Sequence, residues 1–311
     1  MQNKNQNHQS NFHEPVLLQA VLDLLVPRPG ERYLDITAGY GGHASAIASA
    51  IGSTGEMTLV DRDPQAIAQL EQAFGSRARI IKDDYAGALA QLSGPYDVIL
   101  ADLGVSSPQL DNSNRGFSFK VSAPLDMRMD STADFTAEQI VNHFTERDLA
   151  DLIYQFGEER QSRPIARAIV QARPLSDTKQ LAQIVARAYR GKSRIHPATR
   201  TFQALRIAVN DELGQLARAL PRIESLLAPG GRIGIISFHS LEDRLVKNFI
   251  RESQTLTPVN KKVVQGKNED VSNPRARSAK LRVAIKNTNG HTLDSPRRTG
   301  AKNKQEVRNG H

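Results

Sequence analysis

The sequence of 311 residues contains neither cysteine nor tryptophan. The absence of cysteine excludes disulfide bonds, thiolate metal sites and cysteine nucleophiles. The sequence also lacks an apolar run long enough to cross a bilayer, and its N-terminus is polar rather than similar to a signal peptide. We therefore expect a soluble, cytoplasmic protein with no membrane partner.

Acidic residues are scarce at the C-terminal end. Residues 261–311 contain 13 Lys and Arg against 4 Asp and Glu, whereas the whole chain has a formal net charge of +8. The first 260 residues are therefore close to neutral. A basic end of this kind suits a phosphate-rich partner, but it also suits a segment that only keeps the protein in solution.

One glycine-rich stretch organises the N-terminal half of the chain. Residues 34–43 read LDITAGYGGH, in which apolar residues lead into an acid and a glycine-rich bend, and a helical pattern follows. This order is typical of the first half of a nucleotide-binding βαβ unit. Asp61 ends the next apolar run, 20 residues beyond Gly41, the spacing at which a carboxylate reaches ribose hydroxyls.

The same loop fits two cofactors. Residues 39–44 match G-x-G-x-x-A, a nicotinamide dinucleotide fingerprint. Asp35, immediately before the loop, favours S-adenosylmethionine instead, because a carboxylate repels a pyrophosphate but attracts the cationic amino and sulfonium groups. An ordinary glycine turn is the third interpretation, and the loop alone leaves all three open.

Strand and helix patterns alternate over the first hundred residues and predict a parallel, doubly wound α/β sheet. The expected strands are 32–37, 56–61, 78–82 and 96–102, and the expected helices are 43–51, 64–74 and 86–92. Residues 136–190 then read as several helices. A further helix over 203–227, stopped by a turn at 228–231, precedes strands at 231–238 and 281–286.

This order predicts an all-helical domain inserted between the fourth and fifth strands, at the edge where such sheets bind ligands. We expect four parts in the chain. They are disordered tails at 1–12 (polar) and 288–311 (basic), a sheet-based core formed by 13–118 and 206–287, and a helical, substrate-recognising insertion at 119–205.

The loop after the fourth strand carries candidate catalytic residues. The amino group of a nucleobase is a poor nucleophile, so an oxygen that accepts its N–H lowers the barrier to attack. Asp102, Ser106 and Ser107 offer such oxygens, although an ordinary loop is the alternative. Methylation at C5 of a pyrimidine commonly uses a cysteine. This chain has none, which leaves attack by a nitrogen or by a ribose oxygen.

Long motifs follow one another along most of the chain. They are residues 13–18 (HEPVLL), 61–64 (DRDP), 102–111, 115–119 (RGFSF), 124–130 (PLDMRMD), 157–160 (GEER), 198–206 (ATRTFQALR), 209–213 (VNDEL) and 237–244 (SFHSLEDR). In this order they closely resemble the RsmH (MraW) family of bacterial ribosomal RNA small-subunit methyltransferases, from about His13 to Lys286.

The resemblance implies a class I S-adenosylmethionine-dependent methyltransferase fold, Rossmann-like, with a helical insertion. It also implies methyl transfer to N4 of a cytidine in the decoding centre of 16S rRNA, near the P site, with the 30S subunit as partner. The positions that match the family's cofactor contacts are Gly41, Gly42, His43, Asp61, Tyr85, Asp102 and Gln109.

Several residues are candidates for RNA contact. Residues 187–206 contain six Arg and Lys and no acid, with aromatic residues between them, which suits phosphate contact and base stacking. A solvated basic helix with Phe202 in the core is the alternative. We expect His239 to organise hydrogen bonds rather than act as a base. The candidate substrate-binding residues are Arg115, Phe117, Asp126, Arg128, Arg194, Arg200, Phe202, Arg206 and His239.

The histidines show no metal-site spacing such as H-E-x-x-H, so we expect no metal. Two other functions compete with an RNA methyltransferase. A nicotinamide dehydrogenase is supported only by residues 39–44, and a ribosome-assembly factor with a vestigial donor pocket is opposed by the intact loop, Asp61 and Asp102. We expect no DNA partner, and the sequence leaves a homodimer open.

Overall fold

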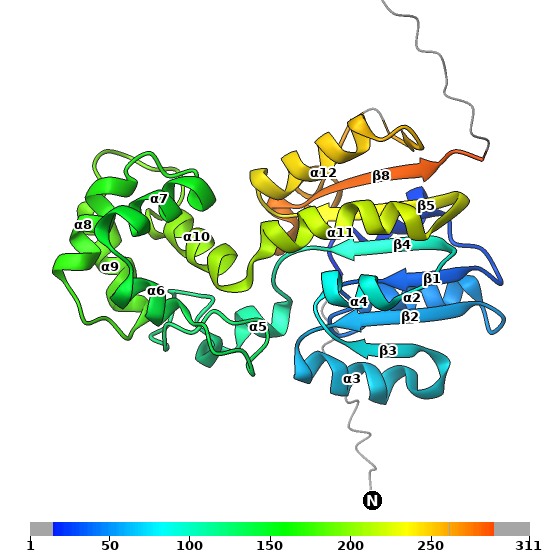
Figure 1. The fold of residues 1–311 in the computed structure, drawn as a ribbon, viewed down its shortest axis with the longest axis horizontal. Coiled ribbons are helices and arrows are strands. Elements are labelled where there is room, and N and C mark those ends of the chain that lie inside the picture. The colour runs from blue at the N-terminus through cyan, green and yellow to red at the C-terminus, as the bar shows by residue number, and fades with distance from the viewer. Residues whose placement is uncertain (1–14, 261, 289–311) are drawn as a thin grey trace, which may run out of the picture.

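The computed structural model describes residues 15–260 and 262–288, which form two parts (Figure 1). One part is a β-sheet covered by helices on both faces, and the other is a cluster of helices at one end of that sheet. The polar N-terminal tail, residues 1–12, and the basic tail, residues 288–311, fall almost wholly outside the described residues. None of the described helices is long and apolar enough to cross a membrane.

The sheet has the strand order β3-β2-β1-β4-β5-β8-β6, and β7 also pairs with β8. The strands from β3 to β5 are parallel, whereas β8 runs antiparallel to β5, β6 and β7. The strands are β1 (Arg32–Asp35), β2 (Glu56–Asp61), β3 (Arg79–Lys82), β4 (Tyr96–Asp102), β5 (Leu227–Ser237), β6 (Leu256–Pro258), β7 (Val264–Gln265) and β8 (Lys280–Lys286). The doubly wound α/β fold predicted from the sequence is confirmed.

Alternate strand residues enter two hydrophobic cores, as period-two side chains do in a sheet buried on both faces. Tyr33 and Leu100 pack on one face with α1 (Leu18–Leu25), α2 (Gly42–Ile51) and α3 (Pro64–Phe74). Leu34 and Ile99 pack on the other face with α4 (Tyr85–Gln91), α11 (Glu212–Leu226) and α12 (Ser240–Glu252). The strand ends are thereby held at fixed positions.

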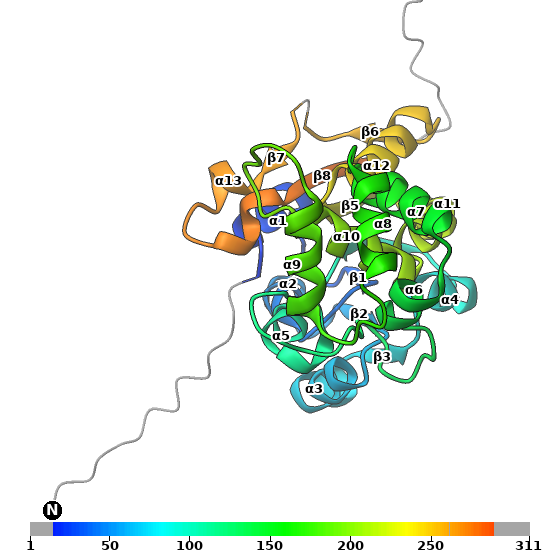
Figure 2. The same cartoon turned by 90° about the vertical axis from the view of Figure 1, so that its left-hand side faces the viewer.

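The helical part lies between β4 and β5 in the sequence, and its helices face the viewer in Figure 2. It has its own buried core. Leu149, Ile165, Leu181 and Leu205, each from a different helix, are completely buried in it. Its helices are α6 (Ala137–His143), α7 (Glu146–Gly157), α8 (Ser162–Gln171), α9 (Thr178–Ala188) and α10 (Ala198–Asn210). We keep residues 119–205 as the proposed extent of the insertion.

The prediction of one helix over 203–227 is wrong, because the chain bends between α10 and α11. Asp211 has a left-handed backbone with φ +47°. The side chain of Asn210 accepts from the N–H of Met129 over 2.8 Å and donates to the carbonyl of Met127 over 2.8 Å. These bonds tie the bend to residues 127–129, which precede the helices of the helical part.

The turn expected at 228–231 is also wrong, because these residues lie inside β5. Pairing jumps from Tyr96–Leu227 to Val98–Arg232, so the four residues form an irregularity in the strand. A third difference is the short helix α5 (Ser107–Asp111), in a segment that the sequence presents as a loop.

Candidate functional site

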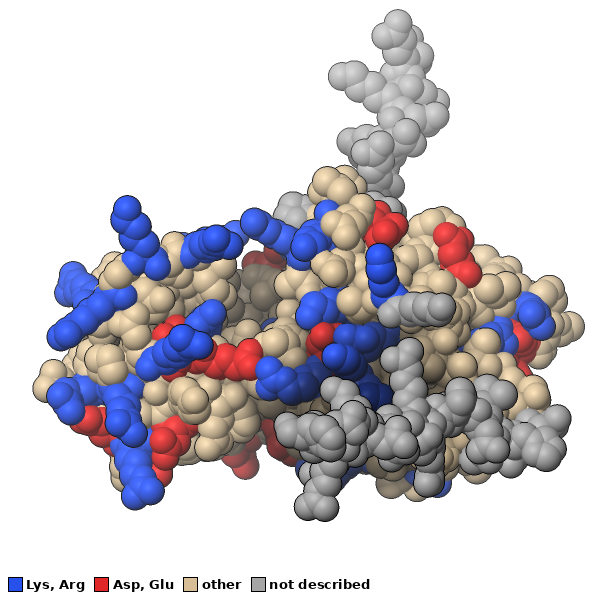
Figure 3. All heavy atoms as spheres, turned by 90° about the horizontal axis from the view of Figure 1, so that it is seen from above, with Lys and Arg blue, Asp and Glu red and all other residues tan. Residues whose placement is uncertain are grey.

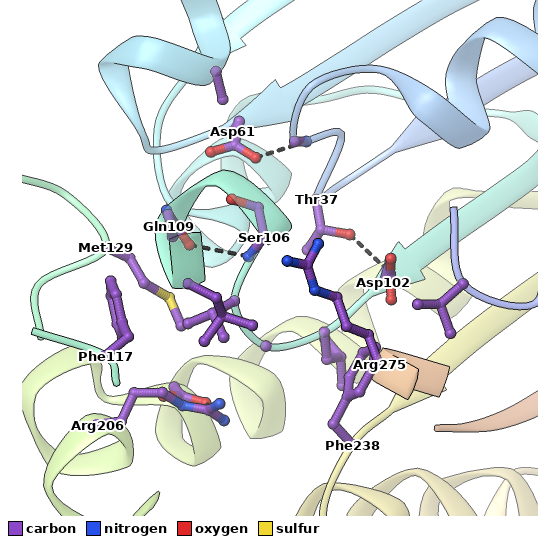
Figure 4. A pocket seen from close by; sticks show the side chains of 18 of the residues that line it. Thr37, Asp61, Asp102, Ser106, Gln109, Phe117, Met129, Arg206, Phe238 and Arg275 are labelled. Carbon is purple, nitrogen blue, oxygen red and sulfur yellow. Dashed lines mark hydrogen bonds and ion pairs between the residues drawn. The ribbon is translucent and has the colours of Figure 1, made fainter. Parts of the chain in front are cut away.

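A cavity of about 760 Å³ opens at the carboxyl ends of the parallel strands, between the sheet and the helical part (Figure 4). It includes the ends of β1 and β4, where the strand order reverses and doubly wound sheets bind their ligands. Predicted residues in its lining are Gly42, His43, Asp61, Tyr85, Asp102, Ser106, Gln109, Phe117, Phe202, Arg206 and His239.

Asp61 holds the glycine-rich loop in place. Its two carboxylate oxygens accept from the N–H of Gly39 and of Asp63, each over 2.8 Å. Gly39 has φ +53°, a conformation that glycine adopts without strain. Burial raises the pKa of Asp61. Each oxygen keeps further lone pairs for a hydroxyl group, so the carboxylate can serve a ribose at the cavity wall.

The two following glycines have different surroundings. Gly41 does not line the cavity, and a Cβ on it would lie 2.8 Å from Phe74 of α3. Gly42 does line the cavity, and a Cβ there would lie 2.6 Å from Pro15. Gly41 is therefore not part of the cavity wall, and its predicted role in cofactor binding stays a prediction.

His43 joins the N-terminal segment to the cavity. Its Nε2 lies 3.0 Å from the Val16 carbonyl, so Nε2 carries the proton and donates to that oxygen. Burial lowers the pKa of His43 to about 4. The ring is consequently neutral at physiological pH and fixes the position of Val16 beside the glycine-rich loop.

Asp35 does not face the cavity, contrary to the role that its place before the loop indicates. Its carboxylate accepts from the Tyr33 hydroxyl over 2.6 Å and from the Thr37 N–H over 3.1 Å, inside the sheet. Burial raises its pKa to about 6. Any influence on a bound cation is therefore exerted through the protein and not by contact.

Asp102 does reach the cavity. Its backbone N–H donates to Thr37 Oγ1 over 2.6 Å, which joins the ends of β4 and β1. Burial raises the pKa of Asp102 well above its usual range, and the charges of Asp35 and Glu242 raise it further. Its buried Oδ1 has no hydrogen-bond partner among the described residues.

Ser106 presents a second acceptor of this kind. Its Oγ is buried without a partner in the described part of the chain, and its N–H donates to Gln109 Oε1 over 3.1 Å. The Gln109 amide in turn donates to Asp63 Oδ2 over 2.7 Å, so Gln109 fixes the loop from the cavity wall. The side chain of Ser107 lies outside what the structure describes.

Aromatic side chains form the wall on the helical side. Phe117, Phe119, Phe202 and Met129 line the cavity, and the rings of Phe119 and Phe202 meet edge to face at 4.9 Å. The rings of His196 and Phe119 also lie close together, with 4.7 Å between their centroids. Phe202 is only 5% exposed, so it serves both the helical core and the cavity. Such a wall can stack on a planar base.

A buried polar cluster completes the wall near Tyr85, which is also buried and donates its hydroxyl to the Glu212 carbonyl. Arg206 donates from Nε and Nη2 to the two carboxylate oxygens of Glu212, each over 2.8 Å. Glu242 accepts at one oxygen from the N–H of Phe238 and of His239. Glu212, Glu242 and Phe238 are cavity residues that sequence reasoning missed, although all three lie in the motifs at 209–213 and 237–244.

The cluster contains three groups that could approach a metal ion. Ligand atoms of Glu212, His239 and Glu242 all lie within 4.8 Å of one another. However, His239 Nδ1 accepts from the Glu242 N–H over 3.3 Å, which leaves the ring proton on Nε2. A metal-bound histidine normally donates from its second nitrogen, so this tautomer suits a hydrogen-bond donor better. The expectation of no metal stays a prediction.

Five predicted substrate residues lie outside the cavity lining. Arg115 is 8% exposed and donates to Asp63 Oδ2 and to two backbone carbonyls. Asp126 and Arg128 pair with each other at 2.7 Å. Arg200 lies 3.6 Å from Glu159, and Arg194 is in the exposed loop that precedes α10. Asp243, in the first turn of α12, pairs with Lys280 and Arg282.

Comparison with known proteins shows the family of the chain. The family model described as "MraW methylase family" matches residues 10–287. The chain belongs to the MraW methylase family. A relative from Synechocystis sp., named "Ribosomal RNA small subunit methyltransferase H", is 50% identical over 88% of this chain and 93% of its own. A relative of the same name from Deinococcus radiodurans is 49% identical over 87% of this chain and 88% of its own.

The family membership establishes that the chain is a methyltransferase and that S-adenosylmethionine is its cofactor. The dehydrogenase interpretation of residues 39–44 is therefore wrong. The residues present fit this cofactor: Asp61 offers acceptors for the ribose, and the unpartnered Asp102 Oδ1 offers a negative charge for a cationic group. Which residues contact the donor remains a proposal.

Proposed function

We propose that the enzyme methylates N4 of one cytidine in the decoding centre of 16S rRNA, near the P site, within the 30S subunit. The names of the relatives support a small-subunit rRNA substrate. The resemblance of the motifs supports the cytidine and its N4 atom. The observation that carries the proposal is the pair of buried, unpartnered oxygens, Asp102 Oδ1 and Ser106 Oγ, beside the donor loop.

In this proposal the donor lies along the ends of β1, β2 and β4. Asp61 binds the ribose, Tyr85 lies beside the adenine, and Gly42, His43 and Gln109 shape the wall. Gly41 contributes through the loop. When bound, S-adenosylmethionine supplies an electrophilic methyl group on a positively charged sulfur, and the carboxylate of Asp102 offsets that charge.

The target amine is held by oxygen acceptors. Asp102 Oδ1 and Ser106 Oγ accept its two N–H groups, which directs the nitrogen lone pair toward the methyl group. Negative charge at Asp102 also stabilises the positive charge that develops on nitrogen during attack. The proton leaves late, to water, so the neutral rings of His43 and His239 need not act as bases.

The RNA enters from the helical side. Phe117, Phe119 and Phe202 stack on the extruded base, and an extruded base is needed because a paired one is out of reach. Arg194, in the loop before α10, and Arg200, in the first turn of α10, contact phosphates in this proposal. Lys and Arg side chains outnumber acidic ones on the face shown in Figure 3, over the helical part and beside the hollow between the parts.

We propose no substrate-binding role for Arg115, Asp126 or Arg128, whose side chains are used inside the protein. The basic C-terminal tail is proposed to add phosphate contacts, and the enzyme to work in the cytoplasm. Neither DNA nor a membrane is needed for this reaction, and the activity is compatible with a monomer or a homodimer.

The proposal is tested with 30S subunits from a strain that lacks the protein. The purified enzyme and labelled S-adenosylmethionine are added to these particles and, in parallel, to naked 16S rRNA. Label on the particle supports the proposal, and label on naked rRNA alone contradicts the 30S substrate. Donor binding without transfer to either would favour the assembly-factor function.

A further inference from the structure

Two N–H groups in the cavity lack an acceptor among the residues that the structure describes. Arg206 uses Nε and Nη2 on Glu212, and its Nη1 makes no hydrogen bond within residues 15–260 and 262–288. The His239 side chain is only 6% exposed, and its Nε2 is buried and has no hydrogen-bond partner among these residues. A buried donor without an acceptor is unfavourable, so Nε2 of His239 suits a ligand that brings an acceptor, and Nη1 of Arg206 remains available to the same ligand.

The position of the His239 proton follows from the start of α12. The Glu242 N–H donates to Nδ1 of His239, as at a helix N-cap, so the neutral ring carries its hydrogen on Nε2. Nε2 lies 3.2 Å from a carboxylate oxygen of Glu242 without forming a hydrogen bond to it. The distance is short enough for a hydrogen bond, but the N–H does not point at the carboxylate oxygen. The N–H can therefore donate to another acceptor.

Both donors are held firmly. Glu212 and Glu242 are 5% and 2% exposed, and the two carboxylates fix Arg206 and the turn at His239 from behind.

The hydrogen-bond donor Arg206 lies apart from the acceptor Asp102. Figure 4 shows Arg206 and Asp102 on different walls of the cavity. The cavity thus offers acceptors at Asp102 and Ser106 and donors at Arg206 and His239. The pairing edge of cytosine has the complementary order, with an amine donor at N4 followed by acceptors at N3 and O2.

We propose that Arg206 and His239 are specificity-determining residues that donate to N3 and O2 of the target cytosine. This inference rests on the proposed function. Uracil would place a carbonyl against Asp102 and an N–H against the donor that faces N3, so two of the three positions on its pairing edge would be mismatched. A site with buried polar groups discriminates strongly against a base that leaves those groups unpaired.

The test uses reconstituted 30S subunits that carry either cytidine or 3-deazacytidine at the target position. The analogue keeps the amine and O2 but replaces N3 by C–H. Single-turnover methyl transfer is measured for the wild-type enzyme, His239→Asn, Arg206→Lys and the control Arg244→Gln. Asn retains the helix cap but lacks the Nε2 donor. Arg244 lies on α12 outside the cavity lining.

The wild-type enzyme and Arg244→Gln are expected to methylate the analogue about 10- to 100-fold more slowly than cytidine, since one buried hydrogen bond is lost. This ratio falls toward one in His239→Asn or Arg206→Lys, while S-adenosylmethionine affinity is unchanged. Equal rates on both bases for the wild type, or an unchanged ratio in both variants, overturn the inference alone. No transfer to cytidine by the wild type overturns the proposed function and this inference with it.

Discussion

His43 Nδ1 lies 3.7 Å from Asp102 Oδ2, and both side chains line the cavity. Burial lowers the pKa of His43 to about 4 and raises that of Asp102 well above its usual range. Both shifts favour the uncharged form, so the imidazole does not supply a positive charge for the carboxylate. A cation that enters the cavity must supply it, which couples donor binding to the ionisation of Asp102.

We predict that S-adenosylmethionine binding releases a proton. A nearby sulfonium stabilises the carboxylate of Asp102 and lowers its pKa. Binding therefore tightens as the pH rises toward the pKa that Asp102 has in the free enzyme, and it levels off above that pKa. Calorimetry in buffers of different ionisation enthalpy measures the released proton. Asp102→Asn should release none, whereas Asp35→Asn should still release a proton, but over a lower pH range, because the charge of Asp35 raises the pKa of Asp102. Equal release by both variants would contradict the assignment to Asp102.

Replacing Asp102 should abolish catalysis without disturbing the RNA interface. We expect Asp102→Asn to lower the methylation rate about 100- to 1,000-fold, the size of effect seen when a preorganised electrostatic partner is removed. Asp102→Ala should abolish detectable turnover. The affinity of both variants for 30S subunits should stay within about twofold of the wild type. Unimpaired turnover in Asp102→Ala would exclude the proposed site.

Gly41 and Gly191 both have a positive φ, but they differ in what a side chain would meet. Their φ values are +84° and +91°, and a Cβ on Gly41 would lie 2.8 Å from Phe74, whereas one on Gly191 meets nothing within 4 Å. Gly191→Ala should cost about 1–2 kcal/mol of unfolding free energy, from the backbone alone. Gly41→Ala should cost more and also weaken donor binding. Denaturant unfolding and calorimetry separate the two effects, and equal losses would show that contact with Phe74 is unimportant.

Arg232 and Glu31 form a partly buried ion pair that stabilises the sheet. The Arg232 guanidinium lies 2.7 Å from Glu31 and also donates to the carbonyls of Leu25 and Val26. Arg232→Met should lower the unfolding free energy by about 1–3 kcal/mol, because Glu31 loses its charged partner and the two carbonyls lose their donor. The double variant with Glu31→Leu should recover part of this loss. No recovery would indicate that the carbonyl contacts, and not the ion pair, carry the stability.

The sequence predicted the sheet and much of the cavity because both follow from local patterns. Strand alternation and the glycine loop placed Asp61 and Asp102 at neighbouring strand ends, which parallel strands bring to one edge. The partners of the Arg115 and Asp126 side chains could not be predicted in the same way. Arg115 meets Asp63 across 52 residues of chain, and only the packed fold reveals such a partner.

The missed residues have the same explanation. Glu212 and Glu242 read as acids in the first turn of a helix, where they favour the helix dipole and need no other role. Their function depends on Arg206 and His239 arriving beside them through the bend at Asp211. That bend is set by the side chain of Asn210, whose contacts with residues 127 and 129 have no local signal.

The most direct test of the central claim is to locate the methyl group on the product. 30S subunits methylated by the enzyme in vitro are digested and their 16S rRNA is mapped by mass spectrometry, with Asp102→Ala as the inactive control. The account predicts N4-methylated cytidine at one decoding-centre position and none with the control. A methyl group on a ribose oxygen, on another atom of the base or outside the decoding centre would contradict it.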